Sequence, residues 1–351
     1  MKAAVLKTNK KIVIEEIPIS DPNPNECQIA IKAAGVCSSD IQRSFKKGAY
    51  SYPLVMGHEF SGEVIKLGEN VTDFSKGDRV AVFPLLPCFK CEACKQRIYT
   101  QCKEYDYFGS RRNGAFCEFL NINTWNLIKI PEEVSFKNAA ASEPLSVGIH
   151  ALKRGDFFNS PPKNLVIIGS GFIGILTAMI ASKLSADTEI TIIDRNQFKL
   201  DLLKELEIET LFIKTENHWK TLLTQKRSFE LVIEATGDPS VYQKSIELTK
   251  HSGTLVLMGN ISGDLKIKKE IVSSILRKEM QIRGAWNSDF NSEKQDDWKM
   301  ALSIMKEGLN PSELITKEVS LEELPIVLEK LYFHKERKEE VKIIKAMVTT
   351  F

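Results

Sequence analysis

The sequence predicts an α/β protein with two kinds of domain, a β-rich domain of the barrel type and a doubly wound parallel sheet. Short strand-like runs separated by turn residues fill the first third of the chain and predict the barrel. An apolar run, a glycine-rich turn and a helical pattern then follow one another over residues 164–194. Later strand-like runs alternate with helical patterns, which is typical of a parallel sheet. At 351 residues the chain is long enough for both domains.

The first 146 residues make up the predicted β-rich domain. Residues 35–40 predict a turn that opens a helix, and residues 139–148 predict the start of a helix that leads into the second domain. The parallel sheet is expected over residues 147–283. Residues 284–351 are expected to return to the first domain, because the alternating pattern ends there. The strand-like runs of the first domain cover residues 12–14, 28–32, 63–65, 78–82 and 115–122.

The glycine-rich turn has the context that a dinucleotide-binding turn requires. A strand over residues 165–168 precedes the G-x-G-x-x-G pattern of residues 169–174, and a second strand ends on Asp194. The glycines allow a tight turn and close approach of a pyrophosphate, and the helix start offers free N–H groups. The alternative is a βαβ unit that binds no ligand. The predicted cofactor-binding residues are Gly169, Gly171, Phe172, Ile173, Gly174, Asp194 and Arg195, with Thr236, Gly237, Met258 and Gly259 at the ends of two later strands.

Asp194 predicts the choice of cofactor. A carboxylate at the end of the second strand accepts hydrogen bonds from a ribose diol and repels a 2′-phosphate, so NAD is expected in preference to NADP. Arg195 follows immediately and partly offsets that repulsion. Asp194 can also cap the helix that follows it, and the two roles are compatible.

Composition and patterning exclude several other classes of protein. The formal net charge is +2, so nothing indicates a nucleic-acid partner or a membrane surface. Residues 165–184 have about the length of a membrane span, but the glycine turn and the β-branched run before it argue against one continuous helix. The N-terminus becomes charged too soon for a signal peptide, which predicts a cytoplasmic protein with reduced thiols.

Four of the seven cysteines fall within residues 88–102. Reduced cysteines in a cytoplasmic chain point to metal binding or catalysis rather than to disulfides. Four thiolates at this spacing can surround one tetrahedral zinc ion in a loop that has no core of its own. The sequence therefore predicts a structural zinc lobe with the ligands Cys88, Cys91, Cys94 and Cys102.

Cys37, His58 and Glu143 are scattered in the sequence, each in a turn-like context. A catalytic zinc typically takes three protein ligands and leaves one position for water or substrate. Glu59 is a candidate for a fourth ligand or for a carboxylate that tunes the site without binding the metal. Scattered residues carry no spacing signature, and a lone His58 is more often a core histidine. These residues alone leave two interpretations open, a second metal site or a histidine that belongs to the core.

The order of these motifs resembles the zinc-containing medium-chain dehydrogenase/reductase family over nearly the whole chain. The matching segments are 35–40, 57–59, the four-cysteine lobe, 143–148 and 169–174; the glutamate at 143 resembles the polyol, or sorbitol-type, branch. The resemblance implies a GroES-like catalytic domain and a Rossmann nucleotide domain. It also implies a catalytic zinc on Cys37, His58 and Glu143, a proton-relay hydroxyl on Ser39 and a tuning role for Glu59. A second zinc in the lobe, NAD and a homo-dimer or homo-tetramer complete these expectations.

The loop of residues 105–114 resembles members of the branch that act on phosphorylated polyols, as do residues 84–89, 99–102 and 275–279. Arg111 and Arg112 in this loop are predicted to bind the substrate's phosphate, because a guanidinium makes two parallel bonds to phosphate oxygens. Alternatively the arginines pair with Asp106 or Glu104, or lie at a subunit interface. The resemblance therefore implies a zinc-dependent oxidoreductase that transfers a hydride from a secondary alcohol of a sugar-alcohol phosphate to NAD. The alternatives are oxidation of an unphosphorylated polyol or of threonine, and nucleotide binding without catalysis.

Overall fold

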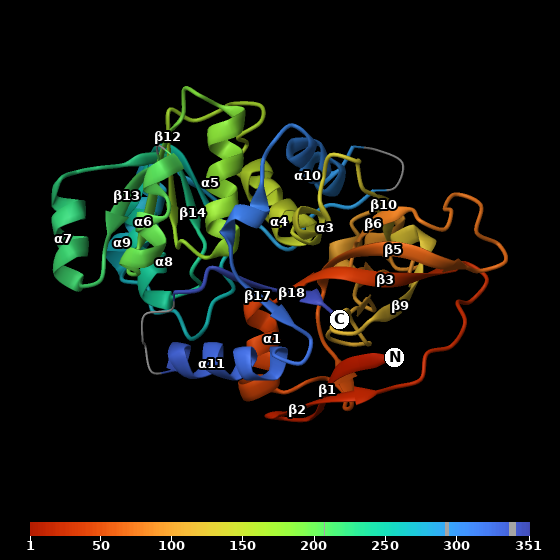
Figure 1. The fold of residues 1–351 in the computed structure, drawn as a ribbon. Helices are drawn as coiled ribbons and strands as arrows, with labels where there is room; N and C mark the ends of the chain where they lie inside the picture. Colours follow the sequence, from red (N-terminus) through yellow and green to blue (C-terminus); the bar gives the residue numbers. More distant parts are fainter. Residues whose placement is uncertain (207, 292–294, 337–341) are drawn as a thin grey trace. The chain divides into compact units, whose positions relative to one another are not determined.

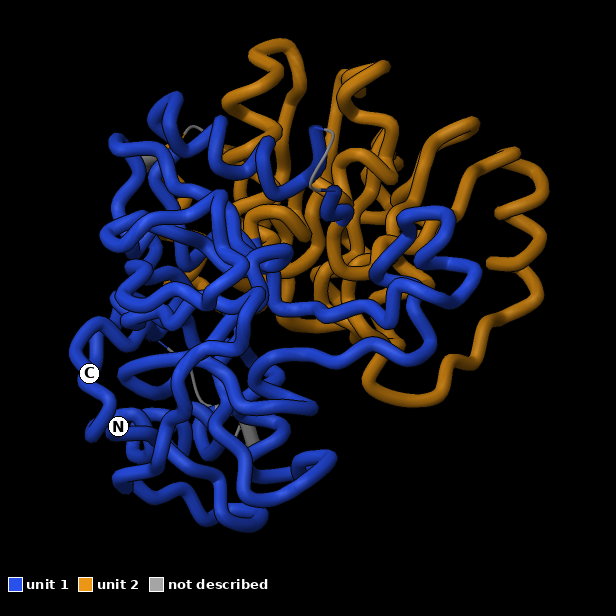
Figure 2. Tube along the Cα trace, turned by 90° about the vertical axis from the view of Figure 1, so that its right-hand side faces the viewer, with its two compact units in different colours: residues 1–144, 289–351 blue, residues 145–288 orange. Residues whose placement is uncertain are grey.

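The computed structural model describes residues 1–351 apart from residue 207 and residues 292–294 and 337–341. The chain divides into two compact units (Figure 2). Unit 1 joins Met1–Pro144 to Asp289–Phe351, and unit 2 consists of Leu145–Ser288. Each unit has a hydrophobic core of its own. The sequence placed the divisions two residues later at the first boundary and five residues earlier at the second.

Unit 1 is built on mainly antiparallel β-sheet, in which β17 and β18 pair in parallel (Figure 1). Its largest sheet has the strand order β10-β6-β5-β3-β18-β17, and β9 also pairs with β3. Smaller sheets have the orders β2-β1-β4 and β7-β8. The bounds are β1 (Lys2–Thr8), β2 (Lys11–Glu16), β3 (Glu26–Gly35), β4 (Leu54–Val55), β5 (Glu59–Leu67), β6 (Arg79–Val82), β7 (Leu85–Leu86), β8 (Asp106–Tyr107), β9 (Phe119–Asn123), β10 (Leu127–Lys129), β17 (Ile315–Ser320) and β18 (Lys345–Thr350).

One strand pairing in unit 1 decides the surroundings of the candidate site. The C-terminal strand β18 runs antiparallel to β3, with Met347 opposite Gly35 and Val348 opposite Ala34. This register brings Lys345 beside the segment that carries Cys37. The helical elements of the unit are α1 (Ser38–Gln42), η1 (Arg43–Lys47), α2 (Glu92–Lys95), η2 (Tyr99–Gln101), η3 (Thr124–Asn126), α3 (Phe136–Ala140), α10 (Asp297–Lys306), η5 (Pro311–Leu314) and α11 (Leu324–Glu336).

Unit 2 contains a six-stranded sheet in the order β13-β12-β11-β14-β15-β16, and every neighbouring pair is parallel. Its central strands are almost fully buried, as expected when helices cover both faces. The expected doubly wound sheet is thereby confirmed. The strands are β11 (Asn164–Ile168), β12 (Glu189–Asp194), β13 (Glu209–Phe212), β14 (Phe229–Glu234), β15 (Thr249–Leu257) and β16 (Gln281–Gly284). The helices are α4 (Ser142–Arg154), whose first three residues belong to unit 1, α5 (Phe172–Leu184), α6 (Gln197–Asp201), η4 (Lys204–Leu206), α7 (Glu216–Thr224), α8 (Pro239–Leu248) and α9 (Lys269–Lys278).

Two details differ from the sequence-based expectations. Gly284 pairs in parallel with β15 and residues 285–288 also belong to unit 2, so the return to the first unit begins at Asp289 and not at residue 284. The strand expected over residues 115–122 begins only at Phe119. In both cases the pairing partner decided the boundary, and strand partners distant in sequence leave little local trace.

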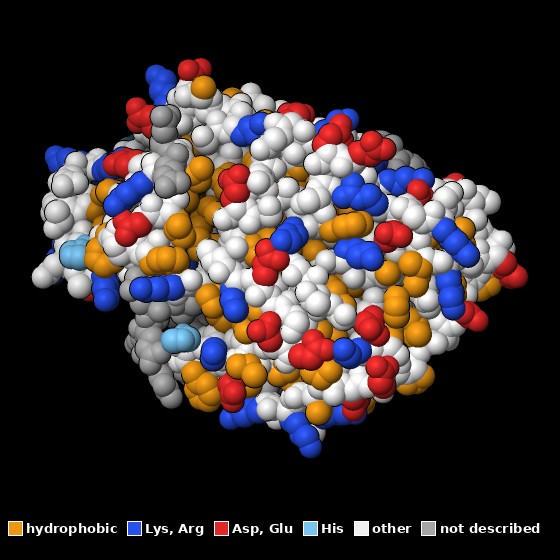
Figure 3. All heavy atoms as spheres, viewed as in Figure 1, with side chains coloured by type: hydrophobic (Ala, Val, Ile, Leu, Met, Phe, Trp, Pro, Cys, Tyr) orange, Lys and Arg blue, Asp and Glu red, His pale blue; other side chains and the backbone are white. Residues whose placement is uncertain are grey.

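Residues 165–184 form a strand and a helix, not a continuous apolar helix. No helix within the described part of the chain is both long and apolar enough to cross a membrane. On the face shown in Figure 3, acidic and basic side chains are interspersed. That face therefore offers no large field of one sign to a polyanion.

Candidate catalytic centre and dinucleotide site

The start of helix α1 positions the first candidate ligand. Cys37 is the N-cap of α1, where its Sγ accepts a hydrogen bond from the backbone N–H of Ser39 at 3.5 Å. Glu59 begins β5 and His58 directly precedes it, and β5 pairs with β3 close to Cys37. The ligand atoms of Cys37, His58 and Glu59 all lie within 4.8 Å of one another. The fold thus gathers three of the scattered candidates into one cluster.

Asp40 is a fully buried carboxylate that the sequence analysis did not single out. It closes the capping box of α1 by accepting the backbone N–H of Cys37 at 3.0 Å. Its Oδ1 also lies 3.5 Å from His58 Nδ1 and 3.3 Å from a guanidinium nitrogen of Arg43. Because Nδ1 faces Asp40, Nε2 is the His58 nitrogen left for a metal. The sequence did contain a signal for Asp40, because it stands at the third position of a helix whose N-cap is the candidate ligand Cys37.

The charge on His58 depends on these neighbours. Burial by itself lowers the pKa of the imidazole, but the carboxylate of Asp40 and the thiolate of Cys37 outweigh burial and raise the pKa well above its usual value. A cation bound in the cluster takes the place of that proton, because a ligating imidazole is neutral. Proton and metal therefore compete for the same nitrogen.

Glu59 is paired with a buried lysine. The ammonium group of Lys345 donates to Glu59 Oε2 and also to the carbonyl oxygen of Val36 at 3.1 Å. The side chain of Lys345 is only 4% exposed, and that of Glu59 is 3% exposed. Glu59 was a candidate for a fourth metal ligand or for a carboxylate that tunes the site. The pairing with Lys345 favours the tuning role, because the charge of Glu59 already has a partner. Sequence reasoning missed Lys345, which lies 286 residues away along the chain.

Glu143 is buried at the start of α4 but is not a member of the three-residue cluster. The hydroxyl of Tyr107 donates to Glu143 Oε1 at 3.3 Å. Burial raises the pKa of Glu143 to about 7, and the neighbouring carboxylate of Glu59 also raises it. A cation nearby would hold the group ionised, so the environment of Glu143 suits a metal ligand.

The donor set in this part of unit 1 fits zinc. It offers a sulfur, an imidazole nitrogen and carboxylate oxygen, which are the ligand types of catalytic zinc sites. Cys37 as a thiolate and Glu143 as a carboxylate bring two negative charges, which match the charge of the ion. The Ser39 hydroxyl oxygen is buried and makes no hydrogen bond within the described part of the chain, which suits a group that receives a proton from a bound molecule.

The four cysteines of the lobe have their sulfur atoms close together. Its four Sγ atoms lie within 4.8 Å of one another, and all four cysteines are reduced. The Sγ of Cys94 lies 3.5 Å from that of Cys91 and 3.9 Å from that of Cys88. The backbone N–H of Cys94 lowers the pKa of Cys91 to about 6, whereas burial raises the pKa of Cys94 to about 12. Four thiols this close fit one tetrahedral zinc ion with thiolate ligands.

The glycine-rich turn of unit 2 has the geometry that its pattern predicted. Gly169 adopts a φ of +114°, which favours glycine. A Cβ atom on Gly174 would collide with the carbonyl oxygen of Gly169, so helix and strand approach closely there. A Cβ on Gly171 would meet open space, where a pyrophosphate would lie. Phe172 and Ile173 begin α5, whose N-cap Gly171 supplies no side-chain hydrogen bond.

Asp194 ends β12 and faces the same turn. One of its carboxylate oxygens accepts the backbone N–H of Ser170 at 2.6 Å, and the other accepts that of Asn196 at 2.8 Å. Helix α6 is capped by Asn196, so the helix-capping role considered for Asp194 falls to its neighbour. Arg195 is exposed beside it. Because an ionised carboxylate has about four acceptor positions, Asp194 keeps the capacity to accept a ribose hydroxyl.

A cavity of about 400 Å³ lies at the carboxyl ends of β14, β15 and β16. Parallel sheets bind ligands at such ends. Glu234 is 2% exposed and accepts the backbone N–H groups of Thr236 at 2.7 Å and of Gly237 at 3.1 Å, which fixes the loop after β14. The sequence singled out only part of this lining. The cavity is lined by Glu234, Gly237, Asp238, Tyr242, Leu257, Met258, Gly259, Asn260, Ile261, Gly284, Ala285 and Trp286.

The two candidate phosphate-binding arginines have different surroundings. Arg111 lies over the rings of Tyr105 at 4.1 Å and Tyr50 at 5.0 Å, and it donates to the backbone oxygen of Tyr105 at 2.9 Å. The Nε atom of Arg112 lies 3.7 Å from Asp106, and both of these side chains are more than two-fifths exposed. The alternative of a structural ion pair therefore describes Arg112 better than Arg111.

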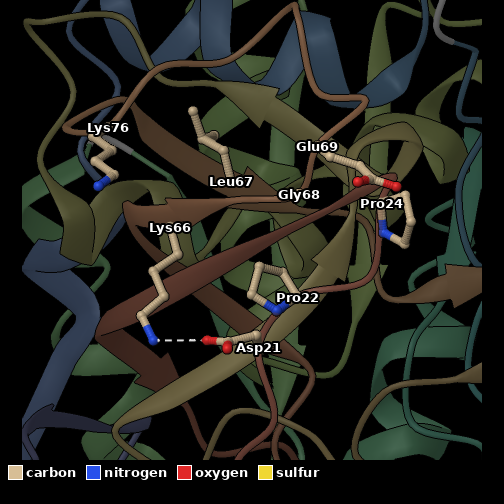
Figure 4. A pocket seen from close by; sticks show the side chains of 8 residues that line it. All are labelled: Asp21, Pro22, Pro24, Lys66, Leu67, Gly68, Glu69 and Lys76. Atoms are coloured by element: carbon tan, nitrogen blue, oxygen red, sulfur yellow. Dashed lines mark hydrogen bonds and ion pairs between the residues drawn. The ribbon is translucent and has the colours of Figure 1, made fainter.

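A second cavity, of about 470 Å³, lies elsewhere in unit 1 (Figure 4). Its charged groups include the exposed ion pair of Lys66 with Asp21 at 3.0 Å. None of the predicted site residues lines it. The lining residues are Asp21, Pro22, Pro24, Lys66, Leu67, Gly68, Glu69 and Lys76.

Family models match both units. Residues 23–132 match the alcohol dehydrogenase GroES-like domain, and residues 173–307 match the zinc-binding dehydrogenase domain. The chain is 33% identical to galactitol 1-phosphate 5-dehydrogenase of Escherichia coli (strain K12) over 311 residues, which cover 88% of this chain and 89% of that protein. It is 29% identical to sorbitol dehydrogenase of Bacillus subtilis (strain 168) over 342 residues, which cover 94% and 93%.

Solved structures agree with these sequence matches. The crystal structure of galactitol-1-phosphate dehydrogenase from Escherichia coli superimposes with a TM-score of 0.88 at 31% identity, covering 99% of this chain and 100% of that chain. The GroES-like fold of unit 1 and the Rossmann-type sheet of unit 2 are thereby confirmed. The chain is an oxidoreductase of the zinc-containing medium-chain dehydrogenase/reductase family and belongs to its polyol dehydrogenase branch.

Proposed function

We propose that this protein is a zinc- and NAD-dependent dehydrogenase that oxidises a secondary alcohol of a sugar-alcohol phosphate. The proposed reaction converts galactitol 1-phosphate to tagatose 6-phosphate, a step of galactitol metabolism. The observation that carries the proposal is the cluster of Cys37, His58 and Glu59 beside Glu143 and the buried, unbonded hydroxyl of Ser39. The similarity to galactitol 1-phosphate 5-dehydrogenase supports the substrate.

Each residue of the centre has a defined role in this proposal. Cys37, His58 through Nε2, and Glu143 hold the ion. When bound, zinc lowers the pKa of a substrate hydroxyl toward neutrality. Ser39 would receive the proton that the hydroxyl loses, and the hydride from the same carbon would pass to the nicotinamide of NAD to give NADH. Asp40 orients His58, and Lys345 holds the charge of Glu59 in place. A second zinc ion binds the four-cysteine lobe and gives two ions per chain.

The substrate's phosphate is proposed to bind Arg111. The two aromatic rings hold its guanidinium in place, and Arg111 belongs to the same loop as Tyr107, which touches Glu143. A fixed guanidinium loses little entropy when it binds a phosphate. Arg112 is the second candidate, although its pairing with Asp106 favours a structural role.

We expect Arg111→Ala to reduce kcat/KM for galactitol 1-phosphate by a factor that corresponds to about 2–4 kcal/mol of transition-state binding. This is the cost of losing one partner from a charged pair. The same variant leaves kcat/KM for free galactitol nearly unchanged, because that substrate has no anionic end. Arg112→Ala serves as the matched control. The measurement is the rate of NADH formation by the wild type and the two variants. The substrates are galactitol 1-phosphate, free galactitol, sorbitol and L-threonine. A wild type that prefers a free polyol or threonine contradicts the phosphate assignment, and absence of turnover with every substrate points to a silent nucleotide-binding relative.

NAD is the proposed cofactor, because the carboxylate of Asp194 faces the glycine-rich turn. We expect Asp194→Ala to lower kcat/KM for NAD by a factor that corresponds to about 1.5–3 kcal/mol of binding free energy. This is the range for a hydrogen bond to a charged group. NADP use improves in the same variant, since the repulsion of a 2′-phosphate is gone. Arg195→Ala is the control for the neighbouring charge and is expected to lower any residual activity with NADP. Equal kcat/KM values for the two cofactors in the wild type would count against this assignment.

The protein is also proposed to form a homo-dimer or homo-tetramer. Strand β16 is an edge of the six-stranded sheet, and Ile282 on it is 37% exposed. Leu276 on α9 is 75% exposed. An edge strand with exposed apolar side chains can pair with the same strand of a second copy about a two-fold axis.

A further inference from the structure

Tyr107 occupies a fixed position between the aromatic cluster of unit 1 and the candidate metal centre. Its carbonyl oxygen accepts the backbone N–H groups of Arg111 at 3.0 Å and of Arg112 at 3.3 Å, so the turn that follows is closed on it. Strand β8 pairs with β7 through Leu85 opposite Tyr107. The ring packs against the cluster of Phe83, Leu85, Phe290 and Trp298. Backbone and ring are therefore both restrained.

The hydroxyl end of the same side chain reaches the metal centre. Tyr107 Oη lies 3.3 Å from Glu143 Oε1, and the ring meets the imidazole of His58 edge-on at 5.8 Å. The phenol O–H is the donor in this contact, because an ionised carboxylate can only accept. Among the described residues, Tyr99 and Tyr105 of the same aromatic cluster make no hydrogen bond to a candidate ligand.

We propose that Tyr107 is a positioning residue of the metal centre, whose hydroxyl holds Oε1 of Glu143 so that the carboxylate presents Oε2 to the ion in one direction. The inference rests on the proposed function, in which Glu143 is a ligand. A carboxylate can bind a metal through one oxygen or through both. A hydrogen bond to one oxygen favours binding through the other, and it removes rotational freedom from the ligand before the ion arrives.

The position of Glu143 shows why such a partner is needed. The carboxylate lies outside the group formed by Cys37, His58 and Glu59, each of which is anchored in or next to β3, α1 or β5. Glu143 comes from a different element, the first turn of α4. Tyr107 links this separate element to β8 and the turn that follows it. The ring of phenylalanine would keep the packing but could not make this link.

The test compares Tyr107→Phe with the wild-type protein in metal binding, with the four-cysteine lobe kept loaded. We expect the zinc affinity of the catalytic centre, measured by competition with a chromogenic chelator, to fall about 10-fold, the lower end of the cost of losing a partner of a metal ligand. The visible absorption of the cobalt(II)-substituted centre is expected to shift as well. Tyr99→Phe removes a hydroxyl from the same aromatic cluster that makes no hydrogen bond to Glu143 in the described part of the chain, and it is expected to change neither signal.

A double-variant comparison separates positioning from general packing. In a Glu143→Ala background, Tyr107→Phe is expected to have no further effect on zinc affinity, because the group it positions is absent. Equal losses with and without Glu143, or unchanged affinity and cobalt spectrum in Tyr107→Phe, overturn the inference while leaving the proposed function intact. Unchanged zinc affinity in both Glu143→Ala and Cys37→Ser instead overturns the ligand assignment, and the inference with it. Thermal unfolding of each variant verifies that it is folded.

Discussion

Cys91→Ser is expected to release one zinc ion per chain and to lower the stability of unit 1 more than any other single change considered for this protein. Between residues 88 and 102 only Cys94 and Cys102 are buried, so the lobe has no apolar core. Structural zinc supplies on the order of 10 kcal/mol of folding free energy in small zinc domains. Burying one large apolar side chain contributes about 1.5–3 kcal/mol. Two small buried cysteines therefore contribute much less to the stability of the lobe than the zinc ion does.

Packing outside the lobe defines how far the damage spreads. Tyr99 and Phe89 of the lobe segment contact Trp125, which also lies against Phe290. Loss of the lobe therefore strips one side from the aromatic cluster of unit 1. Elemental analysis is expected to give one zinc per chain in Cys91→Ser, against two in the wild type, and the unfolding midpoint falls. Two zinc ions in the variant, or one in the wild type, would contradict the two-site assignment.

Cys37→Ser is expected to abolish turnover while leaving the fold intact. Serine keeps the size of the side chain but replaces a thiolate by a neutral hydroxyl, which is a poor zinc ligand. Loss of a direct ligand weakens metal binding by at least about 100-fold, the upper end of the cost of losing an outer partner. The cap of α1 survives, because a serine hydroxyl accepts the backbone N–H of Ser39 as the sulfur does.

The measurement combines activity, metal content and stability. We expect one zinc ion per chain, no NADH formation above background and an unfolding midpoint close to that of the wild type. The neighbouring Ser38→Ala variant is the matched control, since Ser38 is exposed and is expected to retain both ions and full activity. Because Cys91→Ser and Cys37→Ser each lose a different ion, they serve as controls for one another. Turnover in Cys37→Ser at the wild-type rate would disprove a catalytic role for this thiolate.

The features that could be predicted from the sequence are those whose cause is local. The turn needs a positive φ at Gly169 and a close approach of helix and strand at Gly174 that only glycine tolerates, so its pattern can be recognised within six residues. The cysteines of the lobe surround one point because the chain between them is too short to separate them. The helix after Cys37 was likewise predictable, since its capping residues are adjacent in the chain.

Only part of the candidate catalytic centre could be predicted from the sequence. Cys37, His58 and Glu143 were candidates by residue type, and it was the family resemblance that joined them. Their spacing carried no information, because the distance between them is set by strand pairing and not by chain length. Asp40 was missed for a related reason: an acid in the first turn of a helix is common, and only its contact with His58 distinguishes it.

By itself, the sequence determined the two kinds of domain, the dinucleotide turn and the four-cysteine lobe, because each depends on residues that are neighbours in the chain. Only the tertiary structure decided that Lys345 holds Glu59 and that Tyr107 holds Glu143. The first pairing follows from the register of β18 on β3, and the second from a loop folded onto the start of α4. Ion pairs and hydrogen bonds between buried groups require contact within a few ångströms, and for distant residues that contact exists only once the sheets have formed.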